Sequence, residues 1–120
     1  MSQHEVTLLL GSNLGNTKEN VELALARIEK EIGEIICKSE IIHTKAVGFV
    51  SNNIFCNIAI VIKTQFSPIN LLDSIKNMEQ SMGRIVDTRV TIAYTDRIID
   101  IDIVKYGNLK FESYKLVIPH

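Results

Sequence analysis

Two amphipathic segments with recognisable starts and stops place the strongest constraint on the fold of this chain. Residues 16–33 and 67–83 each repeat apolar side chains at helical spacing. Each begins with residues typical of a helix N-terminus and ends at a glycine. The residues that mark these starts and stops are Asn16, Glu19, Gly33, Ser67, Pro68 and Gly83. We therefore expect two helices.

The remaining apolar segments are typical of β-strands, because they are rich in isoleucine and valine, which in Arg97–Val104 alternate with polar residues. The expected strands are Glu5–Leu10, Glu34–Val47 (long or bent), Ile54–Thr64, Arg97–Val104 and Lys110–Val117. The order β-α-β-β-α-β predicts a ferredoxin-like α+β sandwich, in which both helices pack on one face of an antiparallel sheet. We expect a single domain over residues 1–120. Because this fold has many functions, the function must be argued from a site.

The composition excludes several classes of function. The chain is 46% apolar and 22% charged, and its 13 basic and 14 acidic residues give a formal charge of −1. No basic field attracts nucleic acid or an anionic membrane. The apolar run from Val6 to Leu10 is too short to span a membrane. Cys37 and Cys56 have apolar neighbours, so we expect two buried free thiols rather than a disulfide, in a reducing cytoplasm.

The segment from Arg97 to Val104 carries the best candidate for a metal site. Strand side chains alternate between faces, so Asp100 and Asp102 share one face, roughly 7 Å apart along the strand. Two carboxylates suit Mg²⁺, which prefers oxygen ligands and often needs few carboxylates besides substrate phosphates. Arg97 could reach those phosphates. A solvated sheet face decorated with aspartates explains the same residues equally well.

Phe55 and Asn57 share a face of the third expected strand. An aromatic ring beside a carboxamide is a common way to bind a flat heterocycle, by stacking and by hydrogen bonds to its edge. A core phenylalanine near a strand-end asparagine is the simpler explanation. Glu79, on the second helix, is by the same reasoning an ordinary surface charge.

A polar segment of about thirteen residues, from Arg84 to Asp96, follows the second helix, and loops of this length are usually functional or mobile. With Arg84, Arg89 and Arg97 it forms a local basic set that suits phosphates, although a solvated surface loop is the simpler explanation. The Gly11–Gly15 segment lacks a phosphate-binding signature, and a tight strand-to-helix connection explains it.

The ordered set of these residues resembles the 6-hydroxymethyl-7,8-dihydropterin pyrophosphokinase family over essentially the whole chain. The most specific part is Arg97-Ile-Ile-Asp100-Ile-Asp102, which is similar to the signature of that family. The matching segments, in order, are Gly11-Ser12-Asn13, Thr44–Gly48, Phe55-Cys56-Asn57, Glu79, Gly83-Arg84 and Arg97–Asp102.

This resemblance implies transfer of diphosphate from ATP to the hydroxymethyl oxygen of the pterin, with release of AMP. It implies that Asp100 and Asp102 hold two Mg²⁺ ions bound with ATP, and that Arg84 and Arg97 are the catalytic residues that steady the diphosphoryl group. Nucleotide contacts would come from Glu79, Arg84, Arg97 and His120, and pterin contacts from Thr44, Val47, Gly48, Phe55 and Asn57. The segment 84–96 would act as a lid that excludes water. A monomer or weak homo-oligomer is expected.

The chain also departs from the family pattern. It ends at Pro119-His120, where family members continue with a second aromatic residue and another arginine. Thr95-Asp96 precedes Arg97, where the family favours a small residue and often proline, and the segment 84–96 contains Asp87 and no tryptophan. We therefore expect the metal half of the site to be more complete than the pterin half. A shortened relative that binds pterin or nucleotide without efficient turnover, and a ferredoxin-like interaction domain, are the alternatives.

Overall fold

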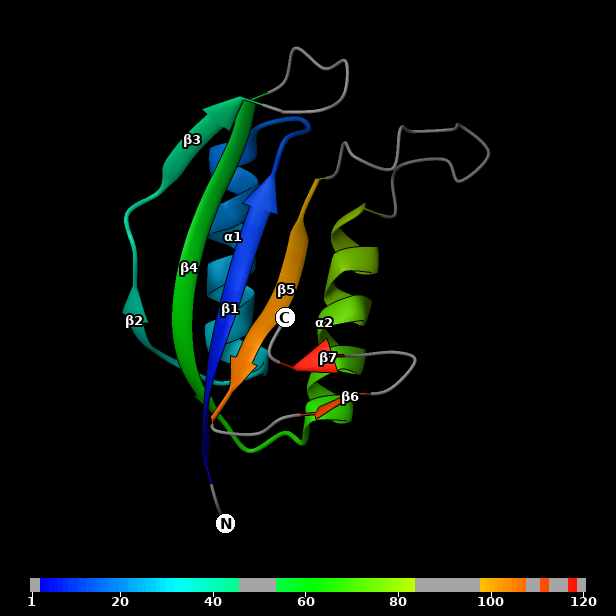
Figure 1. Ribbon diagram of the computed structural model, residues 1–120. Helices are drawn as coiled ribbons and strands as arrows, with labels where there is room; N and C mark the ends of the chain where they lie inside the picture. The colour runs from blue at the N-terminus through cyan, green and yellow to red at the C-terminus, as the bar shows by residue number, and fades with distance from the viewer. Residues whose placement is uncertain (1–2, 46–53, 84–97, 108–110, 113–116, 119–120) are drawn as a thin grey trace.

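The computed structural model describes residues 3–45, 54–83, 98–107, 111–112 and 117–118. Two helices and seven strands follow one another along this part of the chain (Figure 1). The strands are β1 (His4–Ser12), β2 (Glu34–Lys38), β3 (Ile42–Lys45), β4 (Ile54–Thr64), β5 (Asp100–Tyr106), β6 (Phe111–Glu112) and β7 (Val117–Ile118), and the helices are α1 (Thr17–Glu31) and α2 (Pro68–Gly83).

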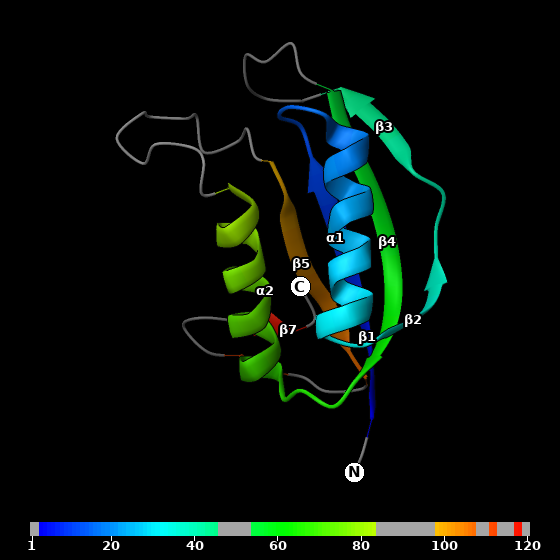
Figure 2. The same cartoon turned by 180° about the vertical axis from the view of Figure 1, so that it is seen from behind.

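Five strands form one antiparallel sheet in the order β2-β4-β1-β5, and β3 also pairs with β4. Both helices cover the same face, which is turned away from the viewer in Figure 1 and toward the viewer in Figure 2. The predicted ferredoxin-like α+β sandwich is therefore confirmed. The long or bent strand expected over 34–47 consists of β2 and β3, which lie along successive parts of β4.

Both helices begin where the sequence predicts. The side chain of Asn16 accepts a hydrogen bond from the Glu19 amide at 3.2 Å, and the Ser67 hydroxyl accepts one from the Asn70 amide at 3.2 Å. These contacts satisfy amides that have no partner within a helix. No helix in the described ranges is long and apolar enough to cross a membrane.

The core lies between the sheet and the helices, because every second residue of the central strands faces α1 and α2. The strands contribute Val6, Leu8, Leu10, Cys56, Ile58, Ile60, Ile62, Ile101, Ile103 and Tyr106, and the helices contribute Val21, Ala24, Ile28, Leu71, Leu72, Ile75 and Met78. Ile99, just before β5, is buried with them. The helix stripes predicted from the sequence are confirmed, with Leu25 and Met82 only partly buried. Burying these side chains leaves the other face of the sheet available for a site.

The prediction of one strand over Lys110–Val117 is wrong. Phe111 pairs with Ile118 and Glu112 pairs with Val117, so β6 and β7 run antiparallel to each other and cannot belong to one strand. The apolar residues at the two ends of this segment produced the signal of a single continuous strand.

Gly33 follows Ile32, the C-cap residue of α1, but the reason for a glycine there differs from the helix stop that the sequence predicts. Within the described residues only Gly15 and Gly107 have a positive φ, so Gly33 is not a left-handed helix cap. A Cβ at Gly33 would lie 2.3 Å from the backbone carbonyl oxygen of Lys63. The glycine therefore permits the close approach of the α1–β2 connection to β4.

Replacing Gly33 by alanine should destabilise the protein by roughly 1–3 kcal/mol, the usual cost of forcing extra volume into a packed region. The free energy of unfolding, measured by urea titration, checks this. Gly83→Ala is the matched control, because nothing lies within 4 Å of the position of its Cβ. Equal stability of the two variants would contradict the steric explanation.

The prediction of two buried thiols is half wrong, because Cys56 is buried and Cys37 is exposed; neither forms a disulfide. Cys37 lies on β2, where the register with β4 shifts between Ile35 and Cys37. This irregularity breaks the alternation of faces that the sequence pattern suggests. Burial also raises the pKa of the Cys56 thiol, which disfavours its reactive thiolate.

We expect Cys37 to react rapidly with a thiol reagent in the folded protein and Cys56 to react only when the protein opens. Absorbance with an aromatic disulfide reagent separates the two phases. Cys37→Ser should remove the fast phase alone, and addition of urea should merge both phases in the wild type. A fast phase that persists in Cys37→Ser would show that Cys56 is accessible.

Candidate functional site

The two aspartates of β5 lie on the sheet face that carries no helix. Asp100 and Asp102 are partly exposed, whereas Ile99, Ile101 and Ile103 are at most 5% exposed and face the core. The predicted sharing of one face by the two carboxylates is therefore confirmed. Their partial exposure leaves them accessible to a ligand.

The strand register brings Asn57, Gly11 and Asp100 into one row across the sheet. Gly11 of β1 pairs with Asn57 of β4 on one side and with Asp100 of β5 on the other. A Cβ at Gly11 would lie 2.6 Å from the carboxamide oxygen of Asn57. The Asn57 side chain therefore occupies space that a side chain at position 11 would need, between β4 and β5.

Gly11 has no role of its own among the site residues predicted from the sequence, although it belongs to a segment that matches the family. The sequence pattern indicates a connecting loop there, whereas β1 continues through Gly11 and Ser12. A glycine within a strand often marks a close approach by another group, and this signal could have identified it.

Phe55 extends the same surface toward β3. It lies two residues before Asn57 on β4, is partly exposed and pairs with Thr44 of β3. Cys56 and Ile58, the alternate residues, are buried. The aromatic ring and the carboxamide therefore share the open face with the aspartates, as expected for a site that binds a flat ring beside a metal.

Glu79 approaches β5 from α2. Its Oε2 accepts a hydrogen bond from the Ile101 amide at 2.7 Å, and its Oε1 lies 3.4 Å from Nζ of Lys76. Burial raises the pKa of Glu79 above its usual range, and the charge of Asp100 acts in the same direction, whereas the Ile101 amide and Lys76 oppose the shift. The simpler explanation of Glu79 as a surface charge is therefore wrong, and its expected contact with the nucleotide remains a prediction.

The donor set on β5 fits a hard divalent cation. Asp100 and Asp102 offer carboxylate oxygens on one accessible face. Within the described part of the chain, no group of three or more histidine, cysteine, aspartate or glutamate residues could hold a metal. Two carboxylates alone match Mg²⁺, which retains waters and takes further oxygens from substrate phosphates.

Several predicted site residues lie outside the described residues. They are Val47, Gly48, Arg84, Arg97 and His120, together with the expected lid over 84–96. Thr44 is described only through its strand pairing. The predictions for these residues remain predictions.

The connection between β1 and α1 is held by Asn20 of α1. The side-chain amide of Asn20 donates hydrogen bonds to the Ser12 hydroxyl at 3.2 Å and to the Leu14 carbonyl at 2.9 Å. Ser12 and Asn13 are buried. These contacts support the interpretation as a tight strand-to-helix connection.

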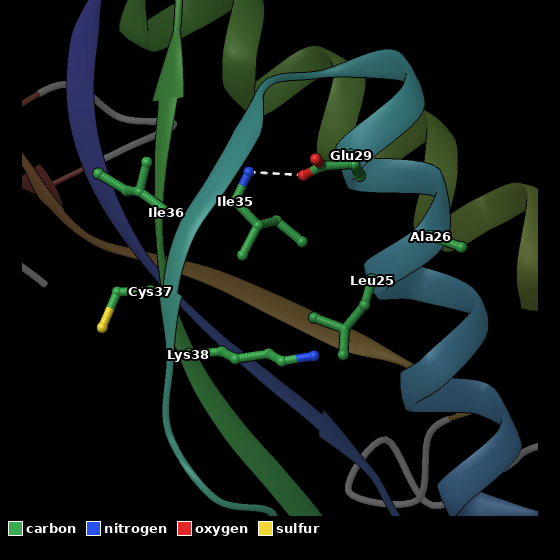
Figure 3. Close-up of a pocket in the computed structure, with 7 residues that line it drawn as sticks. All are labelled: Leu25, Ala26, Glu29, Ile35, Ile36, Cys37 and Lys38. Atoms are coloured by element: carbon green, nitrogen blue, oxygen red, sulfur yellow. Dashed lines mark hydrogen bonds between the residues drawn. The ribbon is translucent and has the colours of Figure 1, made fainter.

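A groove of about 480 Å³ lies elsewhere, between α1 and β2 (Figure 3). Its lining consists of Leu25, Ala26, Glu29, Ile35, Ile36, Cys37 and Lys38. Glu29 accepts a hydrogen bond from the Ile35 amide at 2.6 Å at one end of this groove. None of the predicted site residues lines it, so the groove is separate from the candidate site.

Comparisons with known proteins identify a family for this chain. The sequence model of the 7,8-dihydro-6-hydroxymethylpterin-pyrophosphokinase family matches residues 7–120. A 2-amino-4-hydroxy-6-hydroxymethyldihydropteridine pyrophosphokinase of Porphyromonas gingivalis is 31% identical over 116 residues, which cover 96% of this chain and 78% of that protein.

Two longer relatives match as well. The mitochondrial folate synthesis bifunctional protein of Arabidopsis thaliana is 36% identical over 99% of this chain, and the folic acid synthesis protein fol1 of Schizosaccharomyces pombe is 38% identical over 94%. The chain spans only 21% and 15% of the length of these two proteins. By its family match and its Porphyromonas relative, the chain belongs to the 7,8-dihydro-6-hydroxymethylpterin-pyrophosphokinase family.

Proposed function

We propose that this protein transfers the β,γ-diphosphate of ATP to the hydroxymethyl oxygen of 6-hydroxymethyl-7,8-dihydropterin, a reaction of folate biosynthesis. The new bond joins the hydroxymethyl oxygen to the β-phosphorus. The bond from the β-phosphorus to the oxygen that bridges it to the α-phosphorus breaks, and AMP leaves. The hydroxyl proton is lost to solvent.

The observation that carries this proposal is the row formed by Asn57, Gly11 and Asp100. In this row the Asn57 carboxamide on β4 and the Asp100 carboxylate on β5 lie on either side of β1, which supports a site with a pterin half and a metal–phosphate half. Such juxtaposition matters because diphosphoryl transfer depends on positioning and charge neutralisation more than on a nucleophilic side chain.

Each half of the site has a proposed task. Asp100 and Asp102 would hold two Mg²⁺ ions, which when bound neutralise charge on the ATP phosphates. Phe55 would stack on the pterin and Asn57 would hydrogen-bond its edge. The remaining proposed contacts are Thr44, Val47 and Gly48 to the pterin, Arg84 and Arg97 to the diphosphoryl group, and Glu79 and His120 at the nucleotide end.

Two further features belong to this proposal. The segment 84–96 would close over the bound substrates and exclude water from the transferring group. A cytoplasmic location fits the two free cysteines, since reducing conditions keep thiols unpaired.

The test is AMP formation from ATP, Mg²⁺ and the hydroxymethyl-dihydropterin, followed by chromatography of both products. We expect AMP and pterin diphosphate in equal amounts, and no AMP when the pterin is omitted. ADP in place of AMP would contradict diphosphoryl transfer. Binding of either substrate without AMP release would instead indicate a binding protein without turnover.

A further inference from the structure

The carboxylate of Glu79 is directed at the backbone of β5. Its side chain is only 12% exposed, and Oε2 accepts the hydrogen bond from the Ile101 amide at 2.7 Å. Oε1 lies 3.4 Å from Nζ of Lys76, one turn earlier on the same helix. Both oxygens therefore have partners within the protein.

The amide that Glu79 holds belongs to the peptide between Asp100 and Ile101. A peptide unit is planar, so fixing its N–H also fixes its carbonyl and limits rotation of the backbone at Asp100. Asp102 lies one residue beyond Ile101 on the same strand. The contact therefore acts on the backbone that carries both candidate metal ligands.

The place of β5 in the sheet explains why such a contact is needed. β5 ends the strand order β2-β4-β1-β5, so among the described strands of this sheet only β1 pairs with it. Backbone amides on an edge that lacks a neighbouring strand need another acceptor. Glu79 supplies one from α2, which packs on β5.

The opposite end of the sheet provides a natural comparison. There Glu29 of α1 accepts a hydrogen bond from the Ile35 amide of β2 at 2.6 Å. The two contacts share their chemistry, a helix glutamate bound to an isoleucine amide of the outermost strand. Only the Glu79 contact lies beside the aspartates, so Glu29 is a matched control.

We infer that Glu79 is a positioning residue, which fixes the Asp100–Ile101 peptide and thereby aims Asp100 and Asp102 at the metal–nucleotide complex. This inference rests on the proposed function for the identity of that complex. It gives Glu79 a role through the strand in place of the nucleotide contact that the proposed function takes from the family resemblance, and the experiments below decide between the two.

Amide exchange in the metal-free protein tests the hydrogen bond between the Ile101 amide and Glu79. With ¹⁵N-labelled protein, Glu79→Ala should speed hydrogen–deuterium exchange at the Ile101 amide, on the order of tenfold, because a hydrogen bond to a charged acceptor is lost. Glu29→Ala should instead speed exchange at Ile35 and leave Ile101 unchanged. Unaltered exchange at Ile101 in Glu79→Ala would overturn the inference.

Metal binding tests whether this hydrogen bond orients Asp100 and Asp102. Mn²⁺ can be titrated by electron paramagnetic resonance in the presence of α,β-methylene ATP, whose modified bond resists the transfer. Glu79→Ala should weaken Mn²⁺ binding about 10- to 100-fold, the usual effect of removing a group that orients metal ligands. Glu29→Ala should match the wild type.

Glu79→Gln separates positioning from charge. Its amide oxygen still accepts a hydrogen bond, so we expect Mn²⁺ binding within about threefold of the wild type. A glutamine variant as impaired as the alanine variant would overturn the inference in favour of a direct charge contact with metal or nucleotide. If Glu79→Ala fails to fold in a thermal unfolding scan, the glutamine variant is compared with the wild type instead, and a loss of Mn²⁺ affinity beyond about threefold would overturn the inference.

The tests of the inference about Glu79 do not depend on turnover. If the wild type forms no AMP, the proposed function fails, while the exchange at Ile101 and the Mn²⁺ titration still report on Glu79. If the wild type forms AMP and Glu79→Ala changes neither readout, only the inference about Glu79 fails.

Discussion

Replacing Asp100 by asparagine should lower the rate of AMP formation on the order of 10²- to 10³-fold while leaving the protein folded. Asparagine has nearly the same shape, but it lacks the negative charge that makes a carboxylate a good Mg²⁺ ligand. Charge neutralisation by metal ions is worth several kcal/mol in phosphoryl transfer, and about 1.4 kcal/mol corresponds to a factor of ten in rate. Initial rates measured over a range of Mg²⁺ concentrations check this.

Two controls make the result specific. Asp73→Asn removes a carboxylate from an exposed position of α2 and should leave the rate unchanged. Raising Mg²⁺ should restore part of the Asp100→Asn activity if the loss lies in metal affinity. A rate equal to that of the wild type at every Mg²⁺ concentration would remove Asp100 from the metal site and favour the solvated sheet face.

The sequence predicts the parts of this protein that depend on local patterns. Helix starts at Asn16 and Ser67 follow from capping chemistry within a few residues, and the facing of Asp100 and Asp102 follows from the two-residue period of a strand. Each of these features is decided by neighbours in the chain, so a single sequence is enough to find it.

Features that depend on pairing between distant segments are not predictable in the same way. The exposure of Cys37 follows from a register shift against β4 at the edge of the sheet, although two isoleucines precede it in the sequence. Similarly, the contact between Glu79 and the Ile101 amide joins residues 22 positions apart. The sequence shows a glutamate on a helix, but the acceptor role exists only once α2 packs on β5.

The row of Asn57, Gly11 and Asp100 across the sheet also depends on pairing between distant segments. Phe55 with Asn57, and Asp100 with Asp102, are visible as separate pairs in the sequence, and their mutual placement requires the order β4-β1-β5. Gly11 lies between them on β1 and looks like part of a turn until the register is known. The glycine is thus the residue through which the fold determines the geometry of the site.

Replacing Gly11 by alanine should therefore impair pterin binding with little loss of stability. The new Cβ would lie 2.6 Å from the Asn57 carboxamide oxygen, and the end of a side chain can move away where a backbone carbonyl cannot. Displacing that oxygen costs a hydrogen bond to the pterin, about 1–3 kcal/mol, or roughly a 5- to 150-fold rise in the KM for pterin. Steady-state kinetics with each substrate varied in turn should show a much smaller change in the KM for ATP.

A double-mutant cycle with Asn57→Ala tests whether Gly11 acts through Asn57. If it does, Gly11→Ala should raise the KM for pterin in the wild type but have almost no further effect once Asn57 is alanine, since the group that it displaces is gone. Independent effects that add in the double variant would contradict this coupling. Urea titration of all three variants completes the cycle, because a loss of stability confined to Gly11→Ala would mean that the alanine shifts the backbone of β1 rather than the Asn57 side chain.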